Sequence, residues 1–209
     1  MRIDRIERSQ HKKDRVLVFL EDGACLRITE GELVRFALRA GDELDGDTLA
    51  ALRSAAGSSS AREKAAELIG RRALSRRDLQ RKLKEKGVTE TEARYAADWL
   101  EAIGALNDRE YAGALVRQCA AKGWGPARIR EKLYEKGVPR ALWEEALEEL
   151  PEGGDAIDRF LAQKLRGRAP EEDERRRLTA ALRRRGFSWE EIRQGWERLG
   201  EATEDFFED

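Results

Sequence analysis

Histidine, cysteine and long apolar runs are all scarce in this chain of 209 residues. Its only histidine is His11, and its two cysteines, Cys25 and Cys119, lie far apart in the sequence. One imidazole and two distant thiols do not form a recognisable zinc site, thiol dyad or catalytic triad. We therefore expect no catalytic, cofactor-binding or metal-binding residues and no enzymatic activity. Both cysteines are expected to be small buried side chains.

No stretch of 18 consecutive apolar residues occurs, and the start of the chain, MRIDRIERSQHKKDR, has no apolar segment typical of a secretion signal. The sequence therefore predicts a cytoplasmic protein that does not associate with membranes. A large net charge is also absent, because 41 Lys and Arg oppose 42 Asp and Glu. With aromatic residues spread along the chain, this balance predicts a folded protein rather than a disordered one.

The charges are distributed unevenly along the chain. Residues 61–140 contain 19 Lys and Arg against 12 Asp and Glu, whereas residues 141–209 contain 12 against 19. Residues 1–60 are nearly balanced. The basic middle could contact phosphate groups or an acidic protein surface, and the acidic end would be repelled by nucleic acid. A general coating of nucleic acid is therefore not expected.

The first residues of the chain have the pattern of β-strands. Residues 16–28, VLVFLEDGACLRI, hold two β-prone runs around Asp22 and Gly23, which is typical of a β-hairpin. A short strand near residues 3–6 is expected to join it.

Helical signals follow the predicted hairpin. Thr29 and Glu32 have capping-box spacing, which predicts a helix that continues through Leu38. Another short helix is expected after Asp47. The small, polar run AAGSSS at residues 55–60 then predicts a flexible linker.

Three later segments share one template: DLQRKLKEKGV at residues 78–88, RIREKLYEKGV at 128–138 and RLTAALRRRGF at 177–187. Each has apolar residues eight and four positions before its glycine and another just after it. This spacing predicts a helix that ends in a Schellman-type cap. A helix-start signal follows each glycine, and a helical segment precedes each template, so the repeating unit is three helices of about 50 residues.

The sequence thus predicts a mainly α-helical chain in which three tandem three-helix repeats follow a small β-hairpin and helix region. The predicted boundaries are 1–56 for the N-terminal region, 57–60 for the linker, 61–106, 107–152 and 153–200 for the repeats, and 201–209 for an acidic tail.

A basic stripe distinguishes the first repeat from the second. If Leu79 and Leu83 face the core, then Arg77, Arg81 and Lys84 fall on the opposite side of the helix. The second repeat has Ala127, Glu131 and Tyr134 at these positions, so the fold itself does not require a basic stripe. The stripe is either a solvated face or a contact surface. Further basic residues flank it, namely Arg71, Arg72, Arg76 and Lys82.

Two aromatic segments also have two interpretations. The loop KGWGPARIR places Trp124 beside Arg128 and Arg130, where the indole either anchors a partner or covers the core between two helices. The tail EATEDFFED, at residues 201–209, is either a solubilising end or an acidic, aromatic peptide that binds a basic groove.

Three stretches resemble the RecX family: AAELIGRRALSRRDLQRKLKEKGV at residues 65–88, IGALNDREYA at 103–112 and KGWGPARIREKLYEKGV at 122–138. The resemblance covers residues 63–199 and is specific in the first two repeats. The third repeat matches more loosely, with RGF in place of KGV. Residues 1–60 lie outside these motifs.

The resemblance implies a curved module of three helical repeats that binds RecA filaments on DNA. It implies a regulator in DNA repair, recombination and the SOS response that mostly lowers ATPase, strand-exchange and coprotease activity. We expect a monomer without cofactors and with possible weak contact to single- or double-stranded DNA. The candidate RecA- or DNA-contact residues are Arg71, Arg72, Arg76, Arg77, Arg81, Lys82, Lys84, Trp124, Arg128 and Arg130.

Two alternatives remain open from the residues alone. The chain could be a helical DNA-binding module that uses the basic face of the first repeat to contact phosphates. Its balanced composition, with an isoelectric point near 6.1, disfavours DNA binding as the main activity. A metal-free hydrolase is the other alternative, and no polar residues are spaced to support it.

Overall fold

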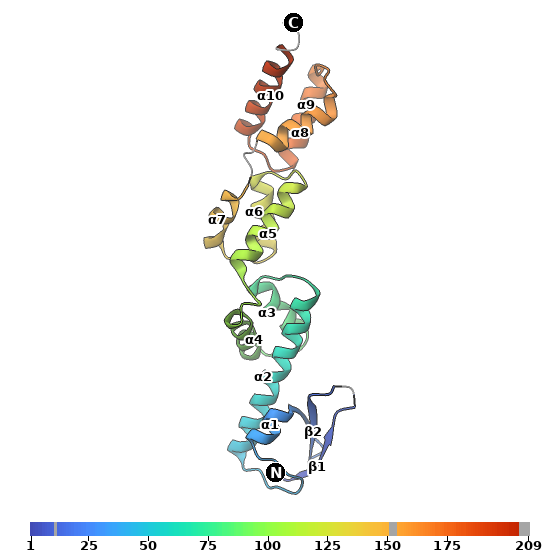
Figure 1. The fold of residues 1–209 in the computed structure, drawn as a ribbon, viewed down its shortest axis with the longest axis vertical. Coiled ribbons are helices and arrows are strands. Elements are labelled where there is room, and N and C mark those ends of the chain that lie inside the picture. Colours follow the sequence, from blue (N-terminus) through green and yellow to red (C-terminus); the bar gives the residue numbers. More distant parts are fainter. Residues whose placement is uncertain (11, 151–153, 205–209) are drawn as a thin grey trace. The chain divides into compact units, whose positions relative to one another are not determined.

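The computed structural model describes residues 1–10, 12–150 and 154–204, with side-chain surroundings as far as residue 200. His11, Phe206 and Phe207 lie outside the described residues. The described chain is mainly α-helical with one small antiparallel sheet at its N-terminal end (Figure 1), which confirms the predicted fold class. It divides into two compact units, Met1–Leu106 and Asn107–Asp209.

The sheet contains β1 (Ile3–Arg8), β2 (Arg15–Leu20) and β3 (Cys25–Thr29), in that order across the sheet. The predicted hairpin is confirmed, because β2 pairs antiparallel with β3 and Gly23 between them has a φ of +82°. Alternate residues of β2, including Val18, are buried, as the two-residue repeat of a strand dictates. Cys25 is exposed at the start of β3, so the expectation that both cysteines are buried is wrong for this one.

The predicted capping box begins α1 (Glu30–Arg35). The Thr29 hydroxyl accepts from the backbone N–H of Glu32 at 3.1 Å, and the Glu32 carboxylate accepts from the backbone N–H of Thr29 at 2.7 Å. The helix ends earlier than the predicted Leu38. Ala37 has a φ of +49°, which lies outside the range of a right-handed helix.

Helix α2 (Gly46–Arg71) replaces the predicted short helix and linker with one continuous helix of 26 residues. The linker prediction for residues 57–60 is therefore wrong. Leu52 is buried in the core beneath the sheet, whereas Ala61 and Ala65 are buried in the core of the first repeat. Burial in two cores stabilises the helix against the weak helical propensity of its glycine and serines.

An ion pair between a buried arginine and a half-buried glutamate joins the sheet to this helix. Arg15 on β2 has only 6% of its side chain exposed, and its Nη2 lies 2.8 Å from the Glu63 carboxylate. Its Nη1 also donates to the hydroxyl of Ser59 at 2.8 Å. A serine of the expected linker therefore satisfies a buried guanidinium, which requires an ordered backbone at that position.

Each repeat template forms a helix that ends at a glycine in the left-handed region. The φ angles of Gly87, Gly137 and Gly186 are +75°, +71° and +91°. In the first repeat the backbone N–H of Val88 donates to the carbonyl of Leu83, as in a Schellman cap. The helices of the three repeats are α2, α3 (Arg76–Glu85) and α4 (Glu90–Ala102); α5 (Asp108–Ala121), α6 (Pro126–Glu135), η1 (Arg140–Leu142) and α7 (Trp143–Glu148); and α8 (Gly154–Leu165), α9 (Glu172–Arg184) and α10 (Trp189–Glu204).

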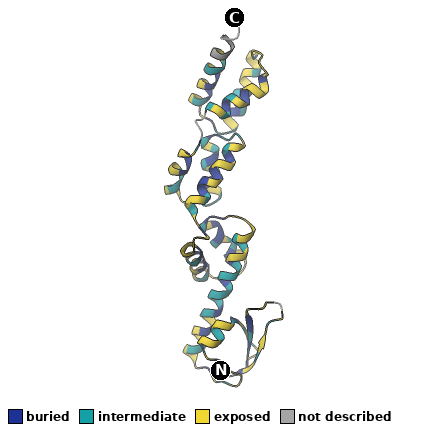
Figure 2. Cartoon of the chain, in the orientation of Figure 1, coloured by how far each residue is buried: buried dark blue, intermediate teal, exposed yellow. Residues whose placement is uncertain are grey.

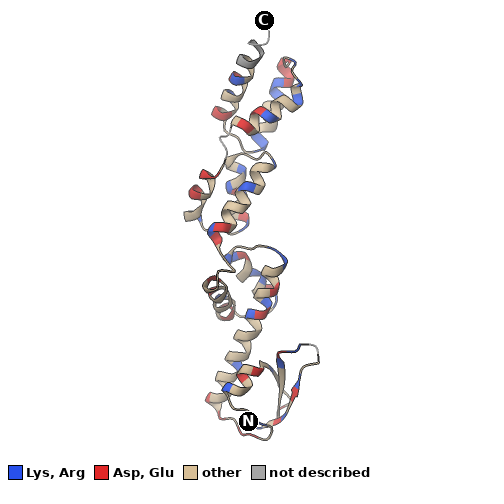
Figure 3. Ribbon diagram, in the orientation of Figure 1, with Lys and Arg blue, Asp and Glu red and all other residues tan. Residues whose placement is uncertain are grey.

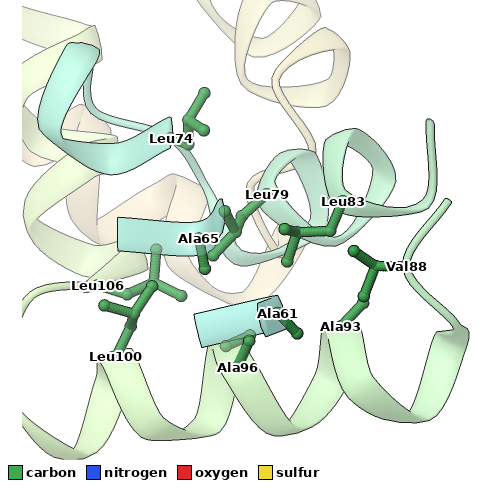
Figure 4. Packing of buried hydrophobic residues seen from close by; sticks show 11 residues of the cluster. Ala61, Ala65, Leu74, Leu79, Leu83, Val88, Ala93, Ala96, Leu100 and Leu106 are labelled. Atoms are coloured by element: carbon green, nitrogen blue, oxygen red, sulfur yellow. The ribbon is translucent and has the colours of Figure 1, made fainter. Parts of the chain in front are cut away.

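Each repeat has its own hydrophobic core, and a fourth core lies under the sheet. Each part of the chain therefore has buried residues of its own (Figure 2). In the first repeat, Leu79 and Leu83 of α3 are fully buried and lie close to Ala65 of α2 and Ala96 of α4 (Figure 4). Cys119 of α5 is buried in the core of the second repeat.

Candidate interaction surface

The first turn of α3 sets which side chains face the solvent. The buried hydroxyl of Ser75 caps the helix by accepting from the backbone N–H of Asp78 at 3.1 Å. Because Leu79 and Leu83 are fully buried, the opposite side of α3 faces the solvent. The structure places the basic stripe of Arg77, Arg81 and Lys84 on this exposed side.

Two members of the basic stripe are paired with carboxylates of their own repeat. Arg81 contacts Asp78 and also Glu85, whose Oε1 lies 2.7 Å from the arginine Nη1. Hydrogen bonding to Asp78 raises the pKa of Arg81 above its usual value. Lys84 lies 2.9 Å from the carboxylate of Glu90, and this hydrogen bond lowers the pKa of Glu90. These carboxylates partly offset the positive charge of the basic stripe.

Arg77 is the exception in the basic stripe. It is exposed, and it forms no ion pair with any carboxylate in the described part of the chain. An exposed guanidinium has five N–H donors, and no nearby carboxylate competes for those of Arg77. Arg77 is therefore the residue of the basic stripe that is best placed to bind an external acidic group.

The residues that flank the basic stripe differ in their roles. Arg76 bridges from α3 to Asp98 and Glu101 of α4. Burial opposes the charged form of Arg76, but these carboxylates outweigh it and raise the arginine pKa. Arg71 pairs with Glu67 one turn earlier on α2. Arg76 thus holds two helices together, and it is a weaker candidate for partner contact than Arg77.

Arg72 and Lys82 complete the candidates in the first repeat. Arg72 is exposed at the end of α2, and Lys82 is partly exposed on α3. No ion pair involving either residue is found within the described ranges. Along most helices of the chain, in contrast, basic residues lie among acidic ones (Figure 3).

The candidates of the second repeat belong to the second compact unit. Trp124 is half-buried and packs against the core of that repeat, and the Arg128 guanidinium lies 4.1 Å from its ring centroid. Arg130 pairs with Glu144 at 3.0 Å. Within its unit the loop around Trp124 contacts the third repeat, because the backbone N–H of Gly125 donates to the carbonyl of Arg185 at 2.7 Å.

Two exposed aromatic residues were not singled out from the sequence. Tyr134 and Trp189 have 61% and 65% of their surfaces exposed. They lie three residues before Gly137 and three residues after Gly186, and the guanidinium of Arg183 sits 4.9 Å from the Trp189 ring. An alignment of the three templates on their glycines would have shown both positions as variable and therefore exposed.

Within the described residues, no group of three or more His, Cys, Asp or Glu side chains is arranged to hold a metal ion. The helices of the same residues include none that is both long enough and apolar enough to span a membrane.

Comparison with known proteins identifies close relatives. Residues 107–147 match the family model for the second three-helix domain of RecX. A regulatory protein RecX of Pseudomonas putida is 32% identical over 133 residues, which are 63% of this chain and 85% of the relative. A regulatory protein RecX of Vibrio parahaemolyticus is 32% identical over 135 residues, which are 64% of this chain and 87% of the relative.

Two solved structures share the fold. A crystal structure of a regulatory protein RecX superposes with a TM-score of 0.72 at 25% identity, covering 94% of this chain and 98% of the other. The crystal structure of RecX from Lactobacillus salivarius superposes with a TM-score of 0.63 at 22% identity, covering 69% of this chain and 97% of the other.

Proposed function

Because this chain belongs to the RecX family of regulatory proteins, we propose that it binds RecA filaments on DNA and mostly inhibits their ATPase, recombinase and coprotease activities. It acts as a monomeric cytoplasmic regulator and not as an enzyme. The observation that carries the proposal is the exposed basic side of α3, which includes the unpaired Arg77.

The contrast between repeats supports a role for this surface. The first and second repeats bury the same template positions, yet only the first places Arg77, Arg81 and Lys84 on the exposed side. Packing therefore leaves these positions free to vary, and the stability of the fold does not explain the three cations. A contact with an acidic partner does explain them, and a DNA-bound filament offers both acidic side chains and phosphates.

The ion pairs within the repeat do not prevent such a contact. Arg81 directs two of its five N–H donors to Asp78 and Glu85, and Lys84 directs one of three to Glu90. Exposed pairs of this kind contribute about 0–1 kcal/mol, so an acidic group of the partner can share or replace these carboxylates at little cost. Arg77 loses no partner of its own on binding.

The decisive experiment measures the DNA-dependent ATPase of RecA in the presence of Arg77→Glu. We expect inhibition and filament binding to weaken at least tenfold, which corresponds to about 1.4 kcal/mol. Arg53→Glu is the matched control, because Arg53 is an exposed arginine on α2 of the same compact unit. The control should inhibit RecA as the parent protein does. If Arg77→Glu folds and inhibits equally well, the basic side of α3 is only a solvated face.

Salt dependence distinguishes the proposed function from the alternative, a helical DNA-binding module. Binding to naked DNA through phosphates weakens steeply with salt, whereas binding to RecA adds contacts that salt does not remove. We therefore expect the parent protein to bind RecA-coated DNA more tightly than naked DNA at about 150 mM salt. Equal affinity for the two, with the same salt slope, would favour the DNA-binding module instead.

A further inference from the structure

Backbone hydrogen bonds join the second and third repeats within the second compact unit. The N–H groups of Gly125 and Ala127 donate to the carbonyls of Arg185 and Gly186 at 2.7 and 3.1 Å. The glycines permit this approach, because a Cβ on Gly125 would lie only 2.6 Å from the carbonyl carbon of Gly186. The loop before α6 and the turn after α9 are therefore held together by their main chains.

A hollow of about 280 Å³ lies beside this junction. The end of α5 forms one wall, from Ala120 to Gly123, and one face of α8 forms another, with Phe160 and Gln163. Three cationic side chains line the hollow, namely Lys122, Arg159 and Arg185, and no carboxylate does. We call this feature the junction hollow.

The charges of the junction hollow are not compensated nearby. None of Lys122, Arg159 and Arg185 forms an ion pair with a carboxylate of the described chain, although residues 107–209 contain 23 Asp and Glu against 20 Lys and Arg. Half of the other arginines of the unit pair with a carboxylate, for example Arg117 and Arg198. Three converging cations without a carboxylate favour an anion from outside the protein.

Arg185 is held in place for such a contact. Its guanidinium stacks on Phe160, 4.5 Å from the ring centroid, and its Nη1 lies 3.5 Å from the carbonyl of Gly123. Arg159 donates through Nε to the backbone carbonyl of Asp155 at 3.0 Å, so its Nη groups are available. Guanidinium groups fixed in this way match the oxygens of a phosphate better than a mobile lysine does.

We propose that the junction hollow binds a phosphate group of a nucleic-acid strand. Its volume of about 280 Å³ leaves ample room for a phosphate group. Basic and aromatic side chains also continue along the adjacent loop, where Lys122 and Arg128 lie 5.8 and 4.1 Å from the ring of Trp124. Such a row is typical of a groove that follows a sugar-phosphate backbone, and an isolated acidic side chain of a protein would not need it.

This site goes beyond the proposed function, because it gives the chain a direct contact with nucleic acid that does not involve α3. It predicts that the full-length protein binds a single-stranded oligonucleotide without RecA. The test is fluorescence anisotropy with a labelled oligo(dT) 20-mer at low salt. The informative variant is Lys122→Gln with Arg159→Gln, because both side chains are exposed and neither supports the core.

The double variant should bind oligo(dT) at least tenfold more weakly than the parent protein. Its plot of log affinity against log salt should also become shallower, by ~0.7 for each phosphate of the single strand that the variant no longer neutralises. Lys164→Gln is the control, because Lys164 is an exposed cation on the same helix that does not line the junction hollow. This control should keep the affinity and the salt slope of the parent protein.

Three results would overturn the proposal. The first is failure of the parent protein to bind oligo(dT), and the second is unchanged binding by the double variant. The third is saturation of the site by inorganic phosphate without competition against oligo(dT), which would assign the site to free phosphate. The Arg77→Glu variant should keep oligo(dT) binding, so failure of the α3 proposal and failure of this one give different results.

Discussion

Helices α3 and α6 occupy the same place in successive repeats and share their buried positions but not their exposed ones. Leu79 and Leu83 in α3 correspond to Ile129 and Leu133 in α6, and all four are fully buried. On the exposed side, Arg77 of α3 corresponds to an alanine in α6. The difference shows which positions packing constrains: the buried residues keep their type because each repeat needs a core, whereas the exposed residues are free to adapt to a partner.

The two repeats also differ after their shared glycine. In the first repeat, the Thr89 capping box begins the 13-residue helix α4. In the second, Pro139 precedes a 3₁₀ turn and the six-residue helix α7, and no side chain caps either segment. A weaker start and a shorter helix leave the second repeat with less local stabilisation, although its template helix is equally well buried.

The largest expected effect tests whether the two cores are equivalent. Leu83→Ala and Leu133→Ala each remove a fully buried side chain, so each should lower the free energy of unfolding of its unit by about 2–5 kcal/mol. Urea denaturation followed by circular dichroism measures both losses. A loss below about 1 kcal/mol for either variant would show that its repeat collapses around the cavity, and that the two cores are not equivalent.

A smaller effect on stability should distinguish two of the template glycines, Gly87 and Gly186. A Cβ at Gly87→Ala would meet open space. The substitution should still lower the free energy of unfolding by roughly 1–2 kcal/mol, because the φ of residue 87 is +75°. Gly186→Ala has the same backbone cost, and its Cβ would also collide with the main chain of Arg128. This overpacking should add about 1–3 kcal/mol to the loss of stability caused by Gly186→Ala. Thermal unfolding of the two variants checks the order, and equal losses would mean that the junction between repeats is loosely held.

The smallest effect concerns the ion pair between Lys84 and Glu90, which has no counterpart in the second repeat. The hydrogen bond from Lys84 holds the pKa of Glu90 below its usual value, so the pair stabilises the folded state at neutral pH. This contribution is lost as the pH falls through the lowered pKa and Glu90 becomes protonated. Lys84→Met should therefore be slightly less stable than the parent protein at about pH 7, and the difference should shrink as the pH falls toward about 3.

Tyr134→Met is the matched control for the pH dependence. Tyr134 occupies the position of Lys84 in the second repeat, and the described residues show no ion pair at this position. Its effect on stability should therefore not depend on pH between about pH 3 and about pH 7. Urea denaturation at the two pH values measures both variants, and an NMR titration of the Glu90 carboxyl should show its pKa rising when Lys84 is replaced.

The repeat template allowed much of the fold to be predicted. The prediction failed where the composition of a segment was interpreted without the residues that pack against it. Spacing relative to Gly87 identified the buried leucines of α3, and the Thr29 capping box located the start of α1. The AAGSSS segment was misinterpreted as a linker because its small side chains suggest flexibility. In the folded chain Ala56 is buried under the sheet and Ser59 binds Arg15, so the segment is helical.

The candidate site was predicted in part. The exposure of Arg77, Arg81 and Lys84 followed from helical geometry, because residues four or seven apart share one side of a helix. The partners of these cations did not follow: Glu90 lies beyond the cap of α3, and its contact with Lys84 depends on the direction in which the chain turns at Gly87. Whether α3 binds RecA remains a prediction.

Local patterns in the sequence determined the helical class, the glycine caps and the buried side of each template helix, because apolar spacing and capping act over a few helical turns. The tertiary structure decided the continuity of α2, the ion pair of Arg15 and Glu63, and the junction hollow. Each depends on contacts between residues that lie far apart in the sequence. At such separations, chain geometry and burial determine which groups meet, and no local sequence pattern predicts these contacts.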